Sequence, residues 1–315
     1  MSEGNDRGLR VASLIASGTE IVAALGMGGS LVGRSHSCDY PSWVARLPEL
    51  TRPKIDPDAP SGDIDAAIRG LVDGNHHAYE IDAGGLGRLR PDVIVTQDEC
   101  EYCAASFSEV KEALSCLALP DVELCTLAPR YLPDVRRDFL KVADVLGIPE
   151  RGEALRDRFD ARLRRIRDRT RRLPRRSLVM VEWLDPPMVA GGWMPELARI
   201  AGGEPLLVDD GESRALGWEA VAAADPDHVV VLPCGFSLRR TLSELGTPGI
   251  RDGLGSIAAV RAGRCTILDG KSYLNRPGPR LAASAELLAA ALRPSAHADL
   301  AAAYAPAMVA GWRPP

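Results

Sequence analysis

Two short stretches of this sequence combine histidine and cysteine in a way that could do chemistry. SHSCDYP holds His36 and Cys38, and TQDECEYC, about sixty residues later, holds Cys100 and Cys103. One imidazole and three thiolates can ligate Zn²⁺ or an iron–sulfur cluster. The same four residues could instead contact a larger ligand directly, or could be packed thiols beside a histidine. The spacing leaves metal or redox chemistry, ligand contact and simple packing open.

Two carboxylates lie close to these groups in the sequence. Asp39 could accept a hydrogen bond from His36 and so orient its ring toward a metal ion, and Glu182 directly precedes Trp183 at the end of a predicted strand. A turn at Asp39 and a cap at Glu182 would explain the same residues. The sequence contains no nucleophile elbow, P-loop, glycine-rich dinucleotide motif or HExxH motif, so it does not establish that the protein is an enzyme.

The remaining cysteines fall into two groups. Cys116, Cys125 and Cys265 lie in apolar or strand-like surroundings, which predicts that they belong to the core. Cys234 follows a predicted strand in the same way as Cys100 does, so it has some claim on a functional site.

Length and charge limit the class of protein. A chain of 315 residues exceeds the usual size of one core and predicts two lobes. A net charge of −5 argues against nucleic acid as a partner. No apolar run approaches the roughly 18 residues of a membrane span, and the first residues lack the apolar core of a signal peptide. We therefore expect a cytoplasmic protein without membrane insertion, whose seven cysteines are more naturally thiols or ligands than disulfides.

One pattern occurs twice and indicates how the lobes are built. LGRLRPDVIVTQ (86–97) and AVAAADPDHVVVLPC (220–234) each combine a helix end, a Pro-Asp turn and a β-branched run. Such runs are typical of buried parallel strands. Further strands are predicted at Val11–Ile15, Leu31–Arg34, Asp121–Leu127, Ser177–Glu182 and Arg264–Leu268. The fold class that we predict is α/β, with two Rossmann-like lobes.

A long helical connection is predicted between the lobes. Val135, Phe139, Val142 and Leu146 recur at helical spacing, and a second set follows after a break at Gly147–Pro149. The second set is Leu155, Phe159, Leu163 and Ile166. Twelve arginines between positions 151 and 176, interleaved with acidic residues, favour a solvated helix face with i,i+4 pairs over a binding surface. The predicted domain limits are 9–132, 133–173 for the connection, 174–293, and an Ala- and Pro-rich tail at 294–315.

The stretch SLIASGTEIVAALGM predicts a strand followed by a helix. Ser17 to Glu20 match the capping box S-x-x-E, and Ile21, Ala24 and Leu25 continue at helical spacing. The free N–H groups of this helix would point out of the carboxyl edge of the sheet, where α/β folds bind ligands. A well-capped helix without a ligand would explain the same pattern.

The order of several motifs resembles a known family. RVASLIASGTEIVAALGMGGSLVGRSHSCDYP, LRPDVIVTQ, the helical connection, PPMVAGGWMPELARIAGG, WEAVAAADPDHVVVL and YLNRPGPRLAASAELLAAAL follow one another over roughly residues 10 to 293. This order resembles the helical-backbone (class III) periplasmic binding proteins, and it is most similar to the cobalamin-binding component of vitamin B12 ABC importers. The resemblance implies two lobes joined by one long backbone helix, with the ligand in the cleft between them.

The resemblance also implies a set of ligand-binding residues. A corrin is a broad apolar disc edged with amides, which aromatic faces beside polar tips would suit. Tyr40 and Pro41 match the family's tyrosine-proline, and Tyr273 and Arg276 match its aromatic-x-x-Arg. The expected ligand-binding residues are Ser17, Thr19, Tyr40, Pro41, Gln97, Trp183, Trp193, Tyr273 and Arg276.

Two departures from the family pattern bear on the function. Family members normally carry a signal peptide or lipid anchor, which this sequence does not show. Glu219 matches the glutamate that the carboxyl lobe presents to a permease, but Gly84 occupies the corresponding position of the amino lobe. An ABC permease is therefore not the expected partner.

Three hypotheses follow from these observations. The leading one is a cytosolic protein that binds a cobalamin-like corrinoid, or a related metal chelate, for storage or hand-over. The second is a Zn- or Fe-S-dependent enzyme or redox protein that uses the His36 and cysteine set on the same fold. The third is an importer subunit whose start codon was assigned too far downstream.

Overall fold

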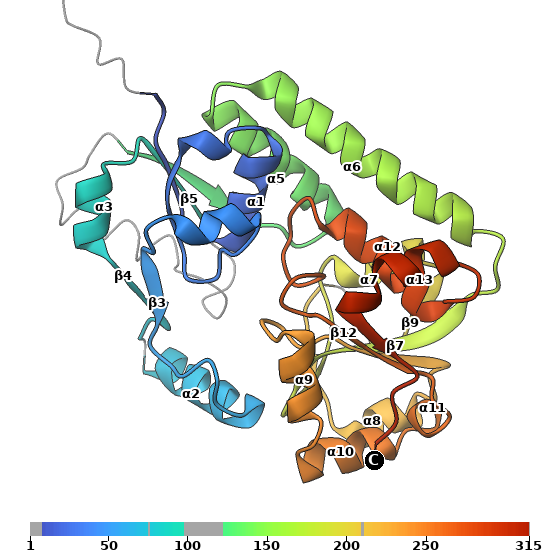
Figure 1. Cartoon of the computed structure of the whole chain (residues 1–315). Helices are drawn as coiled ribbons and strands as arrows, with labels where there is room; N and C mark the ends of the chain where they lie inside the picture. The colour runs from blue at the N-terminus through green and yellow to red at the C-terminus, as the bar shows by residue number, and fades with distance from the viewer. Residues whose placement is uncertain (1–7, 75, 98–121, 209–210, 315) are drawn as a thin grey trace, which may run out of the picture. The chain divides into compact units, whose positions relative to one another are not determined.

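The computed structural model describes residues 8–74, 76–97, 122–208 and 211–314, which form two compact units (Figure 1). The first unit comprises Met1–Asp58, Ala66–Pro129 and Pro133–Asp157, and the second comprises Ala59–Asp65, Arg130–Leu132 and Arg158–Pro315. Three helices contribute residues to both units: α2 (Ser61–Asp73), α5 (Leu132–Val145) through its first residue, and α6 (Pro149–Thr170). No helix among the described residues is long and apolar enough to cross a membrane.

The first unit is built on a sheet of four parallel strands in the order β2-β1-β5-β6. These strands are β1 (Val11–Ser13), β2 (Leu31–Arg34), β5 (Val93–Gln97) and β6 (Glu123–Leu127). Its other elements are α1 (Ala16–Ala24), α3 (Ala83–Leu89), α5 (Leu132–Val145), the 3₁₀ turns Gly28–Ser30 and Ser42–Arg46, and an antiparallel ribbon of β3 (Thr51–Pro53) and β4 (Tyr79–Ile81). Every residue of β5 is buried, as expected for a central parallel strand.

The second unit has a mixed sheet whose centre is parallel. Strands β7, β11 and β12 are parallel neighbours, β9 adds to β7 in parallel, and β8, β10 and β13 pair antiparallel at the edges. The strands are β7 (Arg176–Leu184), β8 (Pro187–Val189), β9 (Gly203–Pro205), β10 (Arg214–Ala215), β11 (His228–Val231), β12 (Cys265–Leu268) and β13 (Met308–Ala310). The helices are α7 (Met194–Ile200), α8 (Trp218–Ala223), α9 (Leu238–Glu244), α10 (Pro248–Gly255), α11 (Ala258–Arg261), α12 (Leu281–Leu292), α13 (Ala298–Ala303) and the 3₁₀ turn Ala305–Ala307. The predicted α/β class is confirmed.

The repeated Pro-Asp pattern has the same local structure in both units. The residue before each proline has a positive φ, 44° in the first unit and 42° in the second. The Asp92 carboxylate accepts a hydrogen bond from Arg10 N at 2.8 Å, and the Asp227 carboxylate accepts one from Ser177 N at 2.9 Å. Each aspartate therefore fixes the start of the neighbouring strand, which explains why the pattern recurs.

The helical connection is present as predicted. All eight positions chosen for helical spacing in α5, α6 and the turn between them are buried. The break is a glycine turn, in which Gly147 has φ +70° and Ile148 N donates to Ala143 O at 2.9 Å. Figure 1 shows α6 as one uninterrupted helix.

The predicted capping box is wrong. The first helix begins at Ala16 with Ile15 at the N-cap and no side-chain cap, and Ser17 lies inside the helix. Strand β1 ends at Ser13, two residues earlier than the predicted Ile15, so the helix starts earlier and Glu20 becomes buried on it.

The tail at 294–315 packs within the second unit. Strand β13 extends the sheet beside β12, and Trp312 N donates to Cys265 O at 3.0 Å. The Trp312 side chain packs against the core of this unit. The predicted domain limits stay a proposal. The packing of the tail within the second unit was not predicted from the sequence.

Candidate functional site

The thiol of Cys38 is enclosed by hydroxyl groups at the carboxyl edge of the first sheet. Thr19 Oγ1 donates to Cys38 Sγ at 3.0 Å, and Ser35 Oγ lies 3.1 Å from the same sulfur. Sγ is also 3.9 Å from Ser13 O, and Cys38 is 1% exposed. Thr19 and Cys38, both predicted as site residues, are therefore in direct contact, and polar groups hold the thiol in one position.

His36 has different partners from Cys38. Its Nδ1 lies 2.8 Å from Thr51 Oγ1, and its ring stacks on Tyr79 with centroids 5.3 Å apart. Burial lowers the pKa of His36, Glu49 opposes this shift and Arg34 adds to it. The lowered pKa favours the neutral imidazole, which is the form that can ligate a metal.

The predicted four-residue metal site stays a prediction. Cys100 and Cys103 lie outside the described residues, so half of the set has no structural account. Among the residues that are described, no cluster of three or more His, Cys, Asp or Glu side chains is arranged to hold a metal ion.

Four further predicted residues lie near the carboxyl ends of β1, β2 and β5. Tyr40 is 47% exposed and is joined to Pro41 by a cis peptide bond. Gln97, the last residue of β5, is buried. Ser17 is also buried, and within the described part of the chain its hydroxyl has no hydrogen-bond partner. Only Tyr40 presents a large accessible surface.

In the second unit, two aromatic rings and a guanidinium form a row, with Trp183 near the end of β7 and with Phe236 and Arg240 after β11. The Trp183 and Phe236 ring centroids are 5.2 Å apart, and the Arg240 guanidinium lies 4.8 Å from the Phe236 centroid. The indole N–H of Trp183 donates to Asp185 O at 3.1 Å. Sequence reasoning predicted Trp183 but missed Phe236 and Arg240, although both follow the second copy of the repeated pattern closely.

Glu182, beside this row, has an unusual protonation behaviour. Burial raises the pKa of Glu182 to about 7, and a hydrogen bond with Ser213 opposes the shift. Its backbone carbonyl accepts from Cys234 N at 2.9 Å, which fixes the start of the loop after β11. The Glu182 side chain can therefore exchange a proton near neutral pH.

The other predicted residues of this unit are linked through one backbone carbonyl. Trp193 Nε1 donates to Leu274 O at 2.6 Å, next to Tyr273. Tyr273 packs edge-on against Tyr304 at 5.9 Å, and Arg276 is buried. The hydrogen bond from Trp193 therefore holds its ring beside the backbone segment that carries Tyr273.

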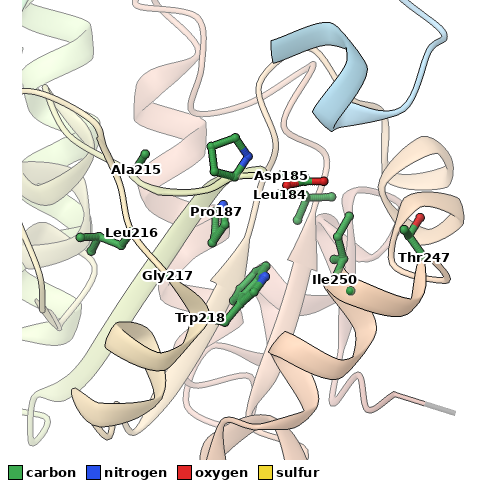
Figure 2. Close-up of a pocket in the computed structure, with 11 residues that line it drawn as sticks. Leu184, Asp185, Pro187, Ala215, Leu216, Gly217, Trp218, Thr247 and Ile250 are labelled. Carbon is green, nitrogen blue, oxygen red and sulfur yellow. The ribbon is translucent and has the colours of Figure 1, made fainter. Parts of the chain in front are cut away.

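A cavity of about 510 Å³ is lined by none of the predicted ligand-binding residues, although Trp183 donates to the lining residue Asp185 (Figure 2). The Trp218 ring forms one wall and packs against Gly253, where an added Cβ would lie 2.3 Å from Trp218 Cδ1. The lining residues are Leu184, Asp185, Pro186, Pro187, Ala215, Leu216, Gly217, Trp218, Thr247, Gly249 and Ile250. The lining is mainly apolar, and the cavity was not predicted from the sequence because its lining segments are distant along the chain.

Three more predictions concern exposure. Cys125 and Cys265 are buried, and burial raises the pKa of their thiols to about 11 and about 12, which confirms them as core residues. Cys116 lies outside the described residues.

Gly84 and Glu219 are both exposed, the first in α3 and the second in the first turn of α8.

The chain has two α/β units whose sheets have parallel strands at their centres, a long helix that contributes to both units, and polar and aromatic groups near the carboxyl ends of the strands. These features are typical of solute-binding proteins with a helical backbone. The chain belongs to the periplasmic binding protein family, whose model matches residues 11–271. No curated protein matches the sequence.

Solved structures of binding proteins share this fold. A periplasmic heme binding protein from Pseudomonas aeruginosa superposes with a TM-score of 0.69 at 25% identity, covering 91% of this chain and 93% of that chain. The heme-binding protein RhuT from Roseiflexus sp. RS-1 gives 0.66 at 26% identity, covering 92% and 100%. The vitamin B12 binding protein BtuF of Vibrio cholerae gives 0.64 at 18% identity, covering 90% and 96%.

Proposed function

We propose that this protein binds a cobalamin-like corrinoid, as a store or hand-over protein for the cofactor. The row of Trp183, Phe236 and Arg240 is the observation that carries the proposal. A flat macrocycle needs an apolar face with polar groups at its rim. The half-buried Trp183 ring can supply the face and Arg240 a polar group at the rim, while Phe236, which is 4% exposed, packs behind the indole. The indole N–H of Trp183 is already paired, and its ring is only partly buried, so the ring can offer apolar surface to a ligand.

Heme is the second candidate, because the similar structures at 25% and 26% identity are heme-binding proteins. Heme and corrinoids are both planar metal chelates with an apolar face. They differ at the rim, where heme carries carboxylates and cobalamin carries amides. The rim chemistry therefore distinguishes the two candidates.

The proposal is tested with purified protein and the two ligands. Hydroxocobalamin and hemin are titrated separately, and binding is followed by absorption and calorimetry. Trp183→Ala is expected to weaken corrinoid binding about tenfold, equal to about 1.4 kcal/mol. Leu242→Ala, at an exposed position of α9, is the control and is expected to leave the affinity unchanged. Absence of corrinoid binding to the unmodified protein would reject the proposal.

The metal or redox hypothesis for His36, Cys38, Cys100 and Cys103 stays a separate prediction. Elemental analysis of protein prepared without oxygen tests it, with a Cys100→Ser/Cys103→Ser variant as the comparison. Zinc or iron bound to the unmodified protein and lost in the variant would support it. The same low metal content in both proteins would contradict it.

Cytosolic location and independence from an ABC permease also stay predictions. The exposed Glu219 and Gly84 are the residues on which the second of these rests. Cell fractionation tests the location, and co-purification with membrane permeases tests the partner.

A further inference from the structure

The first turn of α2 packs on α9 inside the second unit. Arg240 Nη2 donates to Ala59 O at 2.5 Å, and Glu244 Oε1 accepts from Ser61 N at 2.6 Å. Arg240 and Glu244 also pair with each other at 3.1 Å. These two side chains therefore bind one carbonyl oxygen and one N–H group of the same backbone segment.

This combination is the hydrogen-bonding pattern of a carboxamide. An amide side chain offers one acceptor oxygen and an N–H donor, and an adjacent guanidinium and carboxylate match both. A carboxylate offers acceptors only, and it would bring a second negative charge next to Glu244. The pair thus discriminates between amide and acid at a ligand rim.

The first turn of α2 leaves part of the hydrogen-bonding capacity around Arg240 and Glu244 unused. Ser61 Oγ and Arg240 Nε are buried, and neither has a hydrogen-bond partner among the described residues. Unpaired buried polar atoms weaken the docking of the segment. In the whole of α2, only Ser61 and Ile64 are buried. Few contacts hold this turn, so a ligand that pairs these groups better can replace it.

The pair adjoins the aromatic row of the proposed site. Arg240 lies over the Phe236 ring, which in turn contacts Trp183. Phe236 is buried, so a macrocycle would stack on Trp183 and reach Arg240 with its rim.

We propose that Arg240 and Glu244 form a carboxamide subsite, and that the first turn of α2 occupies it until an amide-edged ligand displaces this turn. Arg240 donates to the amide oxygen, and Glu244 accepts from the amide N–H. The inference rests on the proposed function and narrows the ligand to corrinoids with peripheral amides.

The test compares two corrins that differ at the rim. Cobinamide carries peripheral amides, and cobyrinic acid carries carboxylates at the same ring positions. Calorimetry with the unmodified protein is expected to give at least tenfold tighter binding of cobinamide. Glu244→Gln is expected to narrow this ratio to about threefold or less, because the new side chain can donate to a carboxylate. Arg239→Gln, at an exposed neighbouring position, is the control and keeps the ratio.

A second variant tests the displaced turn and leaves the pair intact. An added Cβ at Gly62 would lie 2.7 Å from Asp185 Oδ2, so Gly62→Val must displace either the Asp185 carboxylate or the turn, and it is used to weaken the docking of the turn. We expect tighter cobinamide binding and faster amide hydrogen exchange at Ser61 in the unliganded variant. Weaker binding with faster exchange would show that the turn helps the ligand, which overturns its role as an occupant.

The outcomes separate this inference from the proposed function. If neither corrin binds the unmodified protein, the proposed function fails and the subsite falls with it. If both bind equally well, or if Glu244→Gln leaves their ratio unchanged, the subsite is rejected while the proposed function stands.

Discussion

Arg162 donates two hydrogen bonds to the Glu286 carboxylate, from Nε at 3.1 Å and from Nη2 at 2.7 Å. Tyr304 donates to the same carboxylate at 2.6 Å. Burial raises the pKa of Glu286, but the hydrogen bonds from Arg162 and Tyr304 outweigh it and bring the pKa below its ordinary value. One carboxylate therefore ties α6, α12 and the tail together.

Replacing Arg162 by glutamine should destabilise the protein by about 1–2 kcal/mol, because Glu286 would keep its buried charge without the guanidinium. Arg164→Gln, an exposed position of the same helix, is expected to stay within about 0.5 kcal/mol of the unmodified protein. Urea unfolding at pH 7 measures both. Because the pKa of Glu286 is lowered in the folded state, its ionised carboxylate stabilises the protein at pH values above the unfolded pKa of 4.5. The destabilisation by Arg162→Gln should therefore shrink as the pH falls below 4.5. Equal effects of the two substitutions would contradict this assignment.

The fold could be predicted because its signals are local and repeated. The Pro-Asp pattern and the helical spacing of Val135 and Phe139 each depend on a few neighbouring residues. The capping box at Ser17 failed for the same local reason, since β1 ends two residues early and moves the serine into the helix. Small shifts of an element boundary change the role of a capping residue completely.

The site was predicted only in part because its contacts join distant segments. Ala59 and Arg240 are 181 residues apart, and Ser61 and Glu244 are 183 apart, so no sequence window contains either pair. The arginine-rich helix α6 likewise has a partner that its local sequence does not predict. A solvated face was expected there, yet Arg162 pairs with a glutamate 124 residues away. Tertiary packing selects these partners, and spacing along one element does not.

The raised pKa of Glu182, about 7, predicts a pH-dependent stability. The folded protein holds this proton more tightly than the unfolded chain, whose value is 4.5. The stabilisation is therefore complete below pH 4.5 and is lost as the pH rises through about 7. From pH 5 to pH 8, the free energy of unfolding of the unmodified protein should fall by about 2–3 kcal/mol more than that of Glu182→Gln. Unfolding curves at both pH values measure the difference, and parallel curves for the two proteins would disprove it.

Burial of Cys125 and Cys265 predicts that both resist alkylation in the folded protein. Their pKa values of about 11 and about 12 leave little thiolate at pH 8. Peptide mapping after iodoacetamide treatment should show both unlabelled, while Cys234, which is only half-buried, reacts. Treatment in urea supplies the control, since all three should then react. Native labelling of Cys125 or Cys265 at the rate of Cys234 would contradict the prediction.

Two glycines of α10 give a matched test of the cavity wall. At Gly253 an added Cβ would lie 2.3 Å from the Trp218 ring, whereas at Gly249 no atom lies within 4 Å. Gly253→Ala must displace Trp218 and should destabilise the protein by about 1–3 kcal/mol, with a shift in tryptophan fluorescence. Gly249→Ala adds a helix-favouring residue in open space and should be neutral or stabilising by up to about 1 kcal/mol. If both variants unfold at the same urea concentration, Trp218 does not rest on Gly253 in solution.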